Sequence, residues 1–374
     1  MNTDYNIIII GGGLAGLTAA LHLSSQKLSV LVIEKNSFPN HKVCGEYISN
    51  EVLPYLQSLG IMPFDSGAHP IDILSLSTLS GKKVEQKLSL GGFGISRYTL
   101  DYLMAEEVKK KAVVKKERVE QIFFNENVFT VKTSEGNSYT SEFVIGAFGK
   151  RSNLDKELKR NFVEKKSPWL AVKAHYECDF PDNVVALHHF DGGYCGLSKV
   201  ENNQVNMCYL ANYNSFKKHK NIPEFEKEVL SKNPFLKEFL KYATSVFETP
   251  LAISQISFET KKPVENHIFM TGDSAGLIHP LCGNGMAMAV HGAKIISEML
   301  IDYYCDKSIS RETLEKRYTQ KWKSVFQKRL YTAAILQKIL MRPAALSLGV
   351  QAAFFIPGAL PHIIKRTHGK KIHA

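Results

Sequence analysis

Apolar residues follow two different periods along this chain, and each period predicts a different kind of layer. Ile7–Ile10 is a continuous β-branched run, which is typical of a strand buried on both faces of a parallel sheet. Leu14–Leu23 is rich in alanine and leucine and predicts a helix, and Ser29–Ile33 predicts a second buried strand. A short buried run returns at His267–Met270. The first three of these segments therefore predict the strand–helix–strand unit of a parallel α/β sheet.

The middle of the chain alternates with period two instead. Four such segments predict an antiparallel sheet, namely Ala171–Cys178, Val184–Phe190, Tyr194–Val200 and Gln204–Leu210. Ile71–Leu79 and Lys82–Leu88 predict two earlier strands around a turn at Ser80–Gly81. A three-stranded meander is predicted from Val113–Ile122, Val128–Thr133 and Tyr139–Ile145.

Helices are predicted where apolar residues recur at helical spacing. The segments are Asn50–Leu59, Tyr98–Lys110, Glu224–Ser231, Phe235–Ala243, Asn284–Tyr304 and Arg311–Leu340. Asn36–Ser49 is too polar and broken to predict a strand. The fold class is therefore α/β, with a Rossmann-like domain that carries the meander as an insertion, an α+β domain built on the antiparallel sheet, and a helical C-terminus.

Composition narrows the class of protein. The 374 residues are 44% hydrophobic, which is enough for a sizeable core, and the formal charge is +11. The six cysteines lack CxxC spacing, so no metal site is expected. The same spacing favours a reducing, cytoplasmic setting. No signal peptide is expected, because the first strand begins almost at Met1. The lysines are not interleaved with aromatic residues on one module, so no nucleic-acid partner is expected.

A glycine motif follows the first predicted strand. Gly11, Gly13 and Gly16 have the GxGxxG spacing, and Glu34 ends the second strand 34 − 16 = 18 residues after the last glycine. The first glycine permits a tight turn, the second lets the backbone approach a pyrophosphate, and the third lets helix and sheet pack closely. An acid at the end of the second strand can accept both ribose hydroxyls. The order of these parts predicts a dinucleotide site.

A second glycine-rich run, Thr271–Leu300, identifies the dinucleotide. Asp273 ends a strand and can accept a hydrogen bond from a ribityl hydroxyl. Pro280 follows, and the backbone N–H groups of Gly283, Asn284 and Gly285 open a long helix, where they can stabilise negative charge at the flavin N1/O2 edge. No second GxGxxG follows a strand. The predicted cofactor is FAD.

Together these segments resemble the single-FAD-domain flavoproteins typified by p-hydroxybenzoate hydroxylase, and within them most closely the geranylgeranyl reductase family. Lys42–Gly45 matches a family segment, and Arg97 matches the family arginine that approaches FAD. The FAD contacts that the motifs and the resemblance imply are Gly11, Gly13, Leu14, Ala15, Gly16, Glu34, Lys35, Cys44, Gly45, Arg97, Gly272, Asp273, Pro280, Gly283, Asn284 and Gly285.

The pattern of predicted strands and helices also indicates how the chain divides. The FAD-binding domain is expected in three parts, 1–70, 95–164 and 259–305. The substrate domain is expected at 71–94 and 165–258, with polar sheet residues outside and apolar ones toward the flavin. C-terminal helices are expected at 306–374.

Two segments depart from the family pattern. Phe148 stands where the family has an aspartate in its Gly-Ala-Asp-Gly motif, so NAD(P)H stays open as the electron donor. Gly193–Leu197 replaces the aromatic-rich substrate motif, so the isoprenoid substrate stays open too. The tryptophan pair of flavin halogenases is missing, since Trp169 and Trp322 lie far apart.

The expected activity is an FAD-dependent oxidoreductase that reduces alkene bonds of a hydrophobic, lipid-like substrate by hydride transfer from reduced flavin. One alternative is an aromatic or polyketide monooxygenase that uses a flavin hydroperoxide, and another is a non-catalytic flavin-binding or electron-relay protein. Cys44 is the candidate catalytic residue, as a proton donor or active-site wall, and its alternative is a small buried hydrophobe. His279 could carry protons or serve only the structure.

An uncharged stretch, Ala344–Pro361, precedes the basic residues Lys365, Arg366, Lys370 and Lys371. Three interpretations remain open for the stretch: an interfacial helix on anionic lipid, a lid over the substrate pocket, or a membrane span. The first would place a cytoplasmic protein at the inner face of the membrane. The oligomeric state is left open.

Overall fold

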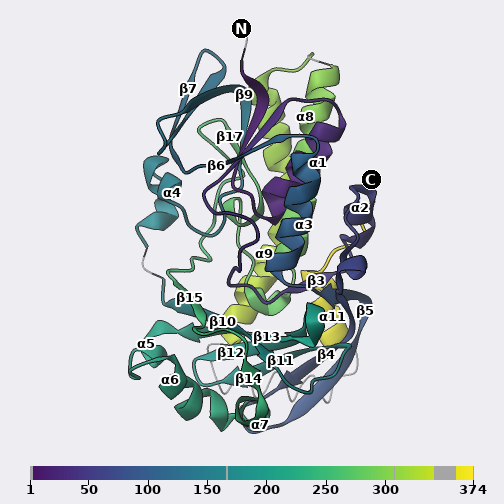
Figure 1. Cartoon of the computed structure of the whole chain (residues 1–374), viewed down its shortest axis with the longest axis vertical. Helices are drawn as coiled ribbons and strands as arrows, with labels where there is room; N and C mark the ends of the chain where they lie inside the picture. The colour runs from purple at the N-terminus through teal and green to yellow at the C-terminus, as the bar shows by residue number, and fades with distance from the viewer. Residues whose placement is uncertain (1–2, 166, 307, 341–358, 374) are drawn as a thin grey trace.

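The computed structural model describes residues 3–165, 167–306, 308–340 and 359–373. Two sheets build the molecule, and Figure 1 shows them one above the other with long helices along one side of the upper sheet. The greater part of the predicted apolar C-terminal stretch, residues 344–358, lies outside the described residues. The predicted fold class is confirmed, with parallel and antiparallel sheets and C-terminal helices.

The upper sheet is parallel at its centre, as the buried N-terminal run predicts. Its path runs β16-β17-β9-β1-β2-β6, in which the pair of β16 and β17 is antiparallel and the other pairs are parallel, and the antiparallel β7 and β8 join it beside β9. Ile8 pairs with Leu31 on one side and with Val144 on the other, and Ile7–Ile9 are fully buried. The strands are β1 (Tyr5–Ile10), β2 (Val30–Glu34), β6 (Val113–Lys116), β9 (Ser138–Gly146), β16 (Val264–Glu265) and β17 (Ile268–Met270).

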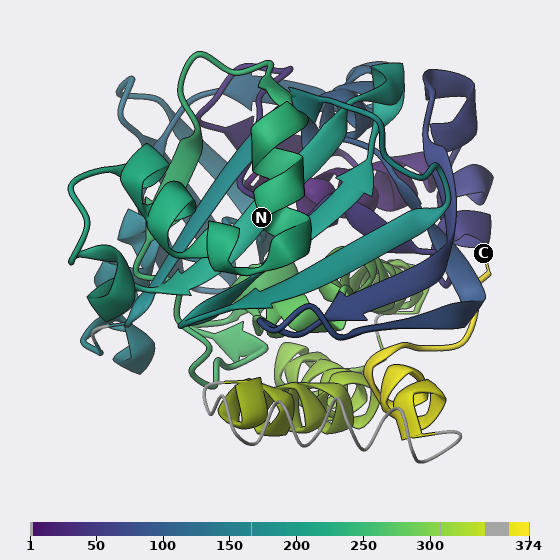
Figure 2. The ribbon, with the colours of Figure 1, turned by 90° about the horizontal axis from the view of Figure 1, so that it is seen from below.

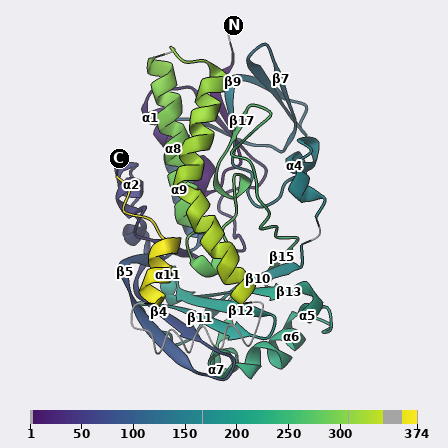
Figure 3. The same ribbon diagram turned by 180° about the vertical axis from the view of Figure 1, so that it is seen from behind.

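Helices cover this sheet and bury apolar residues against it. They are α1 (Leu14–Ser25), α3 (Arg97–Lys109), α8 (Gly285–Cys305) and α9 (Arg311–Leu340), and Figure 3 shows α8 and α9 side by side. In α9 the buried residues Leu314, Tyr318, Trp322 and Phe326 recur every four positions, so one face of the helix packs on the core. Two shorter helices are α2 (Leu53–Ser58) and α4 (Asn153–Glu157).

The meander differs from the prediction at its first strand. The predicted strand Val113–Ile122 is two strands, of which β6 joins the parallel sheet and β7 (Val119–Asn125) pairs with β8 (Val128–Thr133). The chain turns between them at Glu117, whose carboxylate accepts hydrogen bonds from Thr133, Asn137 and Tyr139. These side chains lie elsewhere in the meander, which is why alternation along 113–122 alone did not reveal the break.

The lower sheet has the order β14-β10-β13-β12-β11-β4-β5-β3, with β15 also paired to β10. All its pairs are antiparallel except that of β4 with β11. The expectation of no strand in Asn36–Ser49 is wrong, because Tyr47–Ser49 pairs with the end of β5. The strands are β3 (Tyr47–Ser49), β4 (His69–Ser77), β5 (Lys83–Gly94), β10 (Trp169–Glu177), β11 (Val184–Phe190), β12 (Gly193–Lys199), β13 (Val205–Asn212), β14 (Thr244–Ser245) and β15 (Leu251–Ser254).

The lower sheet was predicted to have polar residues on its outer face and apolar residues on its inner face, and part of this prediction is wrong. Its outer face is apolar, because α5 (Tyr213–Phe216), α6 (Ile222–Glu228) and α7 (Pro234–Tyr242) cover it and bury a core that includes Val172 and Met207. Its inner face, toward the upper sheet, carries the buried Lys173 and His175. Polar residues do not all point outward, since the helices remove the outer face from water.

Among the described residues, none of the helices combines the length and the apolar character needed to cross a membrane. The last described helix, α11 (Ala359–Thr367), packs beside β4 and β5 (Figure 3).

Candidate functional site

One cavity of about 860 Å³ joins the two sheets. At one end it is lined by the glycine loop after β1 and by the loop from His41 to Tyr47. At the other end it is lined by inner-face residues of the lower sheet and by α11. All but two of the predicted FAD contacts line it, so residues up to 274 positions apart in the sequence meet at one site (285 − 11 = 274).

The glycine loop is shaped as its motif predicts. Gly11 has φ +109°, and a Cβ there would overlap the carbonyl oxygen of Ala147 in the neighbouring turn. Gly13 faces the cavity, where a Cβ would lie 3.6 Å from Arg97 Nη2 and 3.9 Å from Lys42 Nζ. Helix α1 begins directly after Gly13 with no side-chain cap and no acid in its first turn. Free N–H groups and two cations thus face one space, which suits a pyrophosphate.

Gly16 is one of the two predicted FAD contacts that lie outside the cavity. It does not line the cavity, and a Cβ there would overlap the carbonyl oxygen of Gly11, so it serves the close packing of α1 on the loop. Glu34 does line the cavity, as does Lys35. The Glu34 carboxylate accepts the N–H groups of Gly12 (2.7 Å) and Asn36 (2.9 Å). A carboxylate can accept further bonds, so Glu34 is fixed in place with acceptor capacity left for a ribose.

Arg97 is held by an acid that the sequence analysis missed. Its Nε and Nη2 each donate to Asp101 at 2.7 Å, and Lys42 Nζ donates to Asp101 Oδ2 at 2.8 Å. Burial opposes ionisation of Asp101, but the two cations outweigh it and lower the pKa of this carboxyl below its usual value. The i, i+4 spacing of Arg97 and Asp101 on a predicted helix was the signal available in the sequence.

The second glycine-rich turn lies across the cavity from the first. Gly272, Asp273, Pro280, Gly283 and Gly285 line the cavity. Gly272 has φ +59° and Gly283 has φ +60°, so both use the left-handed conformation that favours glycine.

Two buried cations fix this turn from behind. Lys261 Nζ donates to the carbonyl oxygens of Asp273 (2.7 Å) and Lys150 (3.0 Å), and Arg160 donates to that of Ser274 (2.9 Å). Burial lowers the pKa of Lys261 to about 8. Neither cation belongs to a recognisable motif in the sequence.

Asn284 is the second exception, since it does not line the cavity. Its Nδ2 donates to the carbonyl oxygen of Thr367 at 2.8 Å, and lies 3.3 Å from Glu51 Oε2. The side chain is therefore engaged with the C-terminal segment, while the neighbouring glycines face the cavity.

Cys44 lines the cavity where the two sheets meet. Its Sγ lies 3.5 Å from Met286 Sδ, and its carbonyl oxygen accepts Asn206 Nδ2 at 3.2 Å. Lys150 Nζ donates to the carbonyl oxygen of Val43 at 3.1 Å. The loop through Cys44 and Gly45 is thus tied to β13 and to the turn after β9.

The same loop carries a buried charge cluster that the sequence analysis did not anticipate. Glu46 Oε1 accepts Lys173 Nζ and the N–H of Arg97 (2.7 Å), and Glu46 Oε2 accepts His175 Nε2 at 2.8 Å. Burial alone would raise the pKa of Glu46, but Lys173 and His175 outweigh it and lower that pKa. Lys173 and His175 occupy alternate positions of β10, where every residue before Lys173 is apolar, and this was the available sequence signal.

His41 lies beside this cluster and lines the cavity. Its ring centroid is 5.3 Å from that of His175 and 4.5 Å from that of Tyr98. Burial, together with Lys173 and His175, lowers the pKa of His41 to about 4, so the imidazole is neutral near pH 7. The cavity wall here is therefore uncharged although buried charges lie behind it.

His279 and Phe148, singled out in the sequence, lie in apolar settings. His279 does not line the cavity; it is buried among the rings of Trp169, Tyr194 and Phe258, and burial lowers its pKa to about 4. Phe148 lines the cavity and packs on the core of the upper sheet. The wall at Phe148 thus has an aromatic ring in place of the family carboxylate.

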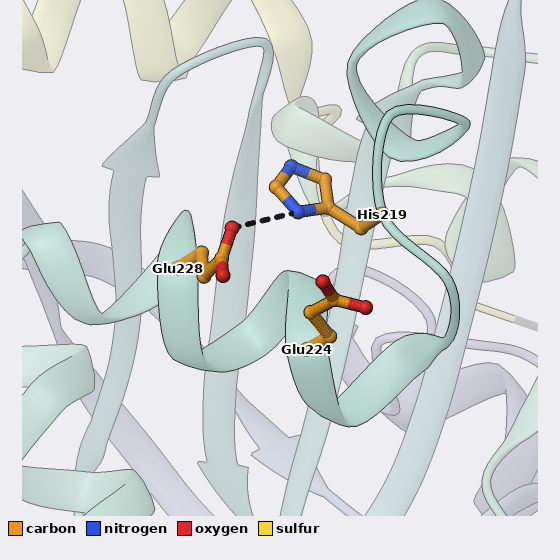
Figure 4. A group of neighbouring side chains, drawn as sticks. All are labelled: His219, Glu224 and Glu228. Atoms are coloured by element: carbon orange, nitrogen blue, oxygen red, sulfur yellow. Dashed lines mark ion pairs between the residues drawn. The ribbon is translucent and has the colours of Figure 1, made fainter.

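A separate group of possible metal ligands lies on the outer helices of the lower sheet (Figure 4). Among the described residues, only His219, Glu224 and Glu228 form such a group, with ligand atoms within 4.8 Å of one another. His219 Nδ1 lies 3.2 Å from Glu228 Oε2, and Glu224 accepts the N–H of Lys220 at 2.9 Å as part of a helix cap. A contact between a half-buried histidine and an exposed carboxylate, together with a helix cap, accounts for the group, and none of its members lines the cavity.

Comparison with known proteins identifies the family. A family model described as "FAD binding domain" matches residues 4–330. The chain belongs to this family. It is thus an FAD-dependent flavoprotein of the oxidoreductase class, and the predicted cofactor is confirmed.

The curated relatives of this flavoprotein have more than one activity in their names. Conditioned medium factor receptor 1 of Dictyostelium discoideum is 24% identical, over 86% of this chain and 68% of the relative. FAD-dependent monooxygenase ntnA of Nectria sp is also 24% identical, but the match spans 81% of this chain and only 45% of that protein. Digeranylgeranylglycerophospholipid reductase of Methanococcus vannielii is 26% identical, over 91% of this chain and 88% of the relative.

Solved structures confirm the fold. The flavin-dependent brominase Bmp2 superposes with a TM-score of 0.79 at 17% identity, covering 97% of this chain and 93% of that one. PqsL of Pseudomonas aeruginosa, a probable FAD-dependent monooxygenase, superposes with a TM-score of 0.73 at 14% identity, covering 92% and 98%. The fold is shared by flavoenzymes of several activities, so the architecture does not select the reaction.

Proposed function

We propose that this flavoprotein reduces carbon–carbon double bonds of an apolar, lipid-like substrate. The observation that carries the proposal is the second lobe of the cavity, which continues from the predicted FAD contacts onto apolar side chains of the lower sheet and α11. These include Leu74, Leu76, Val84, Leu88, Val185, Leu187, Leu360, Ile363 and Ile364. Burying an alkyl chain there is favourable by roughly 0.8 kcal/mol for each CH₂ group. The reductase named for a lipid substrate, matched over most of both chains, supports the same assignment.

The chain's own residues divide the work between the two ends of the cavity. The glycine loop, Arg97 and Lys42 would hold the pyrophosphate, Glu34 would hold the adenosine ribose, and the turn at Asp273 would hold the ribityl chain. Bound FAD supplies two-electron redox chemistry. The apolar lobe orients the substrate and excludes water. The Cys44 thiol lines the cavity between the two ends, where it would be placed to supply the proton that an alkene needs in addition to a hydride.

Gly13→Ala tests the cofactor site. The added Cβ meets only ordinary contacts, so the fold should persist, but it occupies the space in front of Arg97 and Lys42. We expect FAD affinity, measured by fluorescence titration of the apoprotein, to fall about tenfold or more. The thermal unfolding midpoint of the apoprotein should stay unchanged. Unchanged affinity would place the pyrophosphate elsewhere.

The reaction is tested by anaerobic turnover of the photoreduced holoenzyme with isoprenoid alkenes. Stoichiometric reoxidation of the flavin, with a saturated product, supports the reductase. Cys44→Ala should slow product formation while Cys44→Ser, which keeps an exchangeable proton, should be slowed less. Equal rates for both variants would remove Cys44 from the proton transfer.

The second candidate function is a monooxygenase, because one relative carries that name. Oxygen consumption coupled to substrate turnover would support it against the reductase. A third reading, a flavin-binding relay, is motivated by Phe148 in place of the family aspartate. Stopped-flow mixing with NADH and with NADPH tests it, because reduction by neither would point to a different electron donor.

We also propose that the C-terminal segment contacts anionic lipid. Lys365 and Arg366 of α11 and the following Lys370 and Lys371 are exposed, whereas Leu360 and Ile364 of the same helix face inward. Each basic residue near an anionic surface contributes about 1 kcal/mol. Co-sedimentation with phosphatidylglycerol vesicles but not with phosphatidylcholine vesicles is expected, and a variant with all four residues changed to glutamine should lose it.

A further inference from the structure

Glu51 lies just after β3 and its side chain is fully buried. Its carboxylate accepts Arg329 Nη1 of α9 at 3.0 Å and Asn284 Nδ2 at the start of α8 at 3.3 Å. It also accepts the backbone N–H of Gly369, beyond α11. One carboxylate therefore joins the start of α8, the long helix α9 and the C-terminal segment.

Three more features hold the C-terminal segment at the same place. The N–H of Ile372 donates to the carbonyl oxygen of Glu51 at 2.8 Å, and Asn284 Nδ2 donates to that of Thr367 at 2.8 Å. A Cβ on Gly369 would overlap the guanidinium of Arg329 and lie 3.0 Å from Glu51 Oε2. Gly369 is thus the residue that lets the backbone come this close to the ion pair.

The segment fastened in this way forms a wall of the cavity. Leu360, Ile363, Ile364 and Thr367 recur at helical spacing on α11 and line the cavity. Ile364 packs with Leu88 and Val185 of the lower sheet. Figure 2 shows α11, drawn in yellow, beside α9 and next to β4 and β5 of the lower sheet.

We propose that Glu51 is a positioning residue that fastens α11 against the cavity, and that Ile363 and Ile364 set the size of the apolar ligand that the cavity accepts. The size role rests on the proposed lipid-like substrate, whereas the fastening role does not. Glu51→Gln would remove the negative charge that pairs with the Arg329 guanidinium. It would also weaken the hydrogen bonds from Asn284 and Gly369. α11 would then leave the cavity more often, and the wall would be lost.

Trypsin tests the fastening, because the exposed Lys365, Arg366, Lys370 and Lys371 are its cleavage sites. Cleavage of a transiently opened segment tracks the population of the open form. We expect the C-terminal segment of holo Glu51→Gln to be cleaved roughly tenfold faster than that of the wild type. Glu238→Gln, at an exposed position on α7, should match the wild type.

Gly369→Ala provides a second route to the same result, because its Cβ displaces the segment without altering the buried core. Faster cleavage with retained flavin absorbance in either variant supports the fastening role. Wild-type cleavage rates in both variants, or loss of fold in Glu51→Gln with wild-type cleavage in Gly369→Ala, would overturn it.

The size role is tested with saturated primary alcohols from octanol to octadecanol, read by the perturbation of the flavin absorbance band. Ile364→Trp should shorten the longest alcohol that binds, and Ile364→Ala should lengthen it or tighten its binding about tenfold. An identical chain-length limit in both variants would overturn the size role. If no alcohol perturbs the wild-type flavin, the proposed substrate class fails and the size role with it, while the trypsin result still decides the fastening role.

Discussion

Glu46 and Glu51 are two fully buried carboxylates only five positions apart (51 − 46 = 5), yet they fasten different parts of the molecule. Glu46 joins the cofactor loop and the start of α3 to the inner face of the lower sheet, through Lys173 and His175. Glu51 joins the start of α8 to α9 and to the C-terminal segment. One short stretch of chain thus anchors both the lower sheet and the C-terminal segment.

The partners of the two carboxylates differ in chemistry. Lys173 is fully buried, so water cannot solvate its ammonium group if the Glu46 carboxylate is removed. The side chain of Arg329 is 10% exposed, and the other partners of Glu51 are neutral N–H groups. The comparison teaches that the Glu46 cluster pairs two fully buried charges, whereas the cation of the Glu51 cluster keeps an edge in water.

The largest effect is expected for Glu46→Gln. It leaves the Lys173 ammonium buried without its counter-charge, which costs about 3–5 kcal/mol of unfolding free energy. Urea unfolding followed by circular dichroism measures it. The double variant Glu46→Gln/Lys173→Met should recover most of the loss, and a single-variant loss below about 1 kcal/mol would show that the charge pair is not obligatory.

A smaller effect is expected for Glu51→Gln in the same measurement, about 1–3 kcal/mol. Glutamine keeps an acceptor for the N–H of Gly369, and the exposed edge of Arg329 can reach water. A loss equal to or greater than that of Glu46→Gln would reverse the comparison.

At neutral pH the smallest effects are expected from replacing the histidine that lies beside each carboxylate. Burial and nearby cations lower the pKa of His41, beside Glu46, to about 4, and burial and Arg329 lower that of His291, beside Glu51, to about 4. The unfolded chain binds these protons near pH 6.5, so the unfolding free energy should fall as the pH drops from about 6.5 to about 4. Glu46, whose pKa is lowered, adds a further loss only as the pH falls below its usual value of 4.5.

His41→Gln and His291→Gln should each make the unfolding free energy less dependent on pH in that range. The exposed His362→Gln serves as the control and should retain the wild-type slope. Unfolding midpoints recorded across the range decide the matter; a wild-type slope in both variants would mean that neither imidazole is held neutral by the fold.

The glycine loop and the elements around it could be predicted because their parts are local. β1, the glycine loop, α1 and β2 lie within thirty residues, from Tyr5 to Glu34, and each glycine has a steric reason that its spacing reveals. Arg97 was reached through the family resemblance. Asp101, its partner on the same helix, was within reach of an i, i+4 argument that was not made.

The interior of the lower sheet could not be predicted in the same way. Period-two alternation identifies the two faces of a strand but not which face water reaches, and α6 and α7 cover the face expected to be polar. Glu46 and Lys173 are 127 residues apart, and alternation within one strand carries no signal for a partner at that distance. The break at Glu117 was missed for the same reason.

The sequence by itself determined the cofactor, the parallel sheet around it and the helices that cover it, because backbone sterics and apolar periodicity act between near neighbours. Only the tertiary structure decided which buried charges meet on the inner face of the lower sheet and that the C-terminal helix lines the cavity. Those pairings are made by groups brought together from distant parts of the chain, and a buried charge is stable only where its partner already lies.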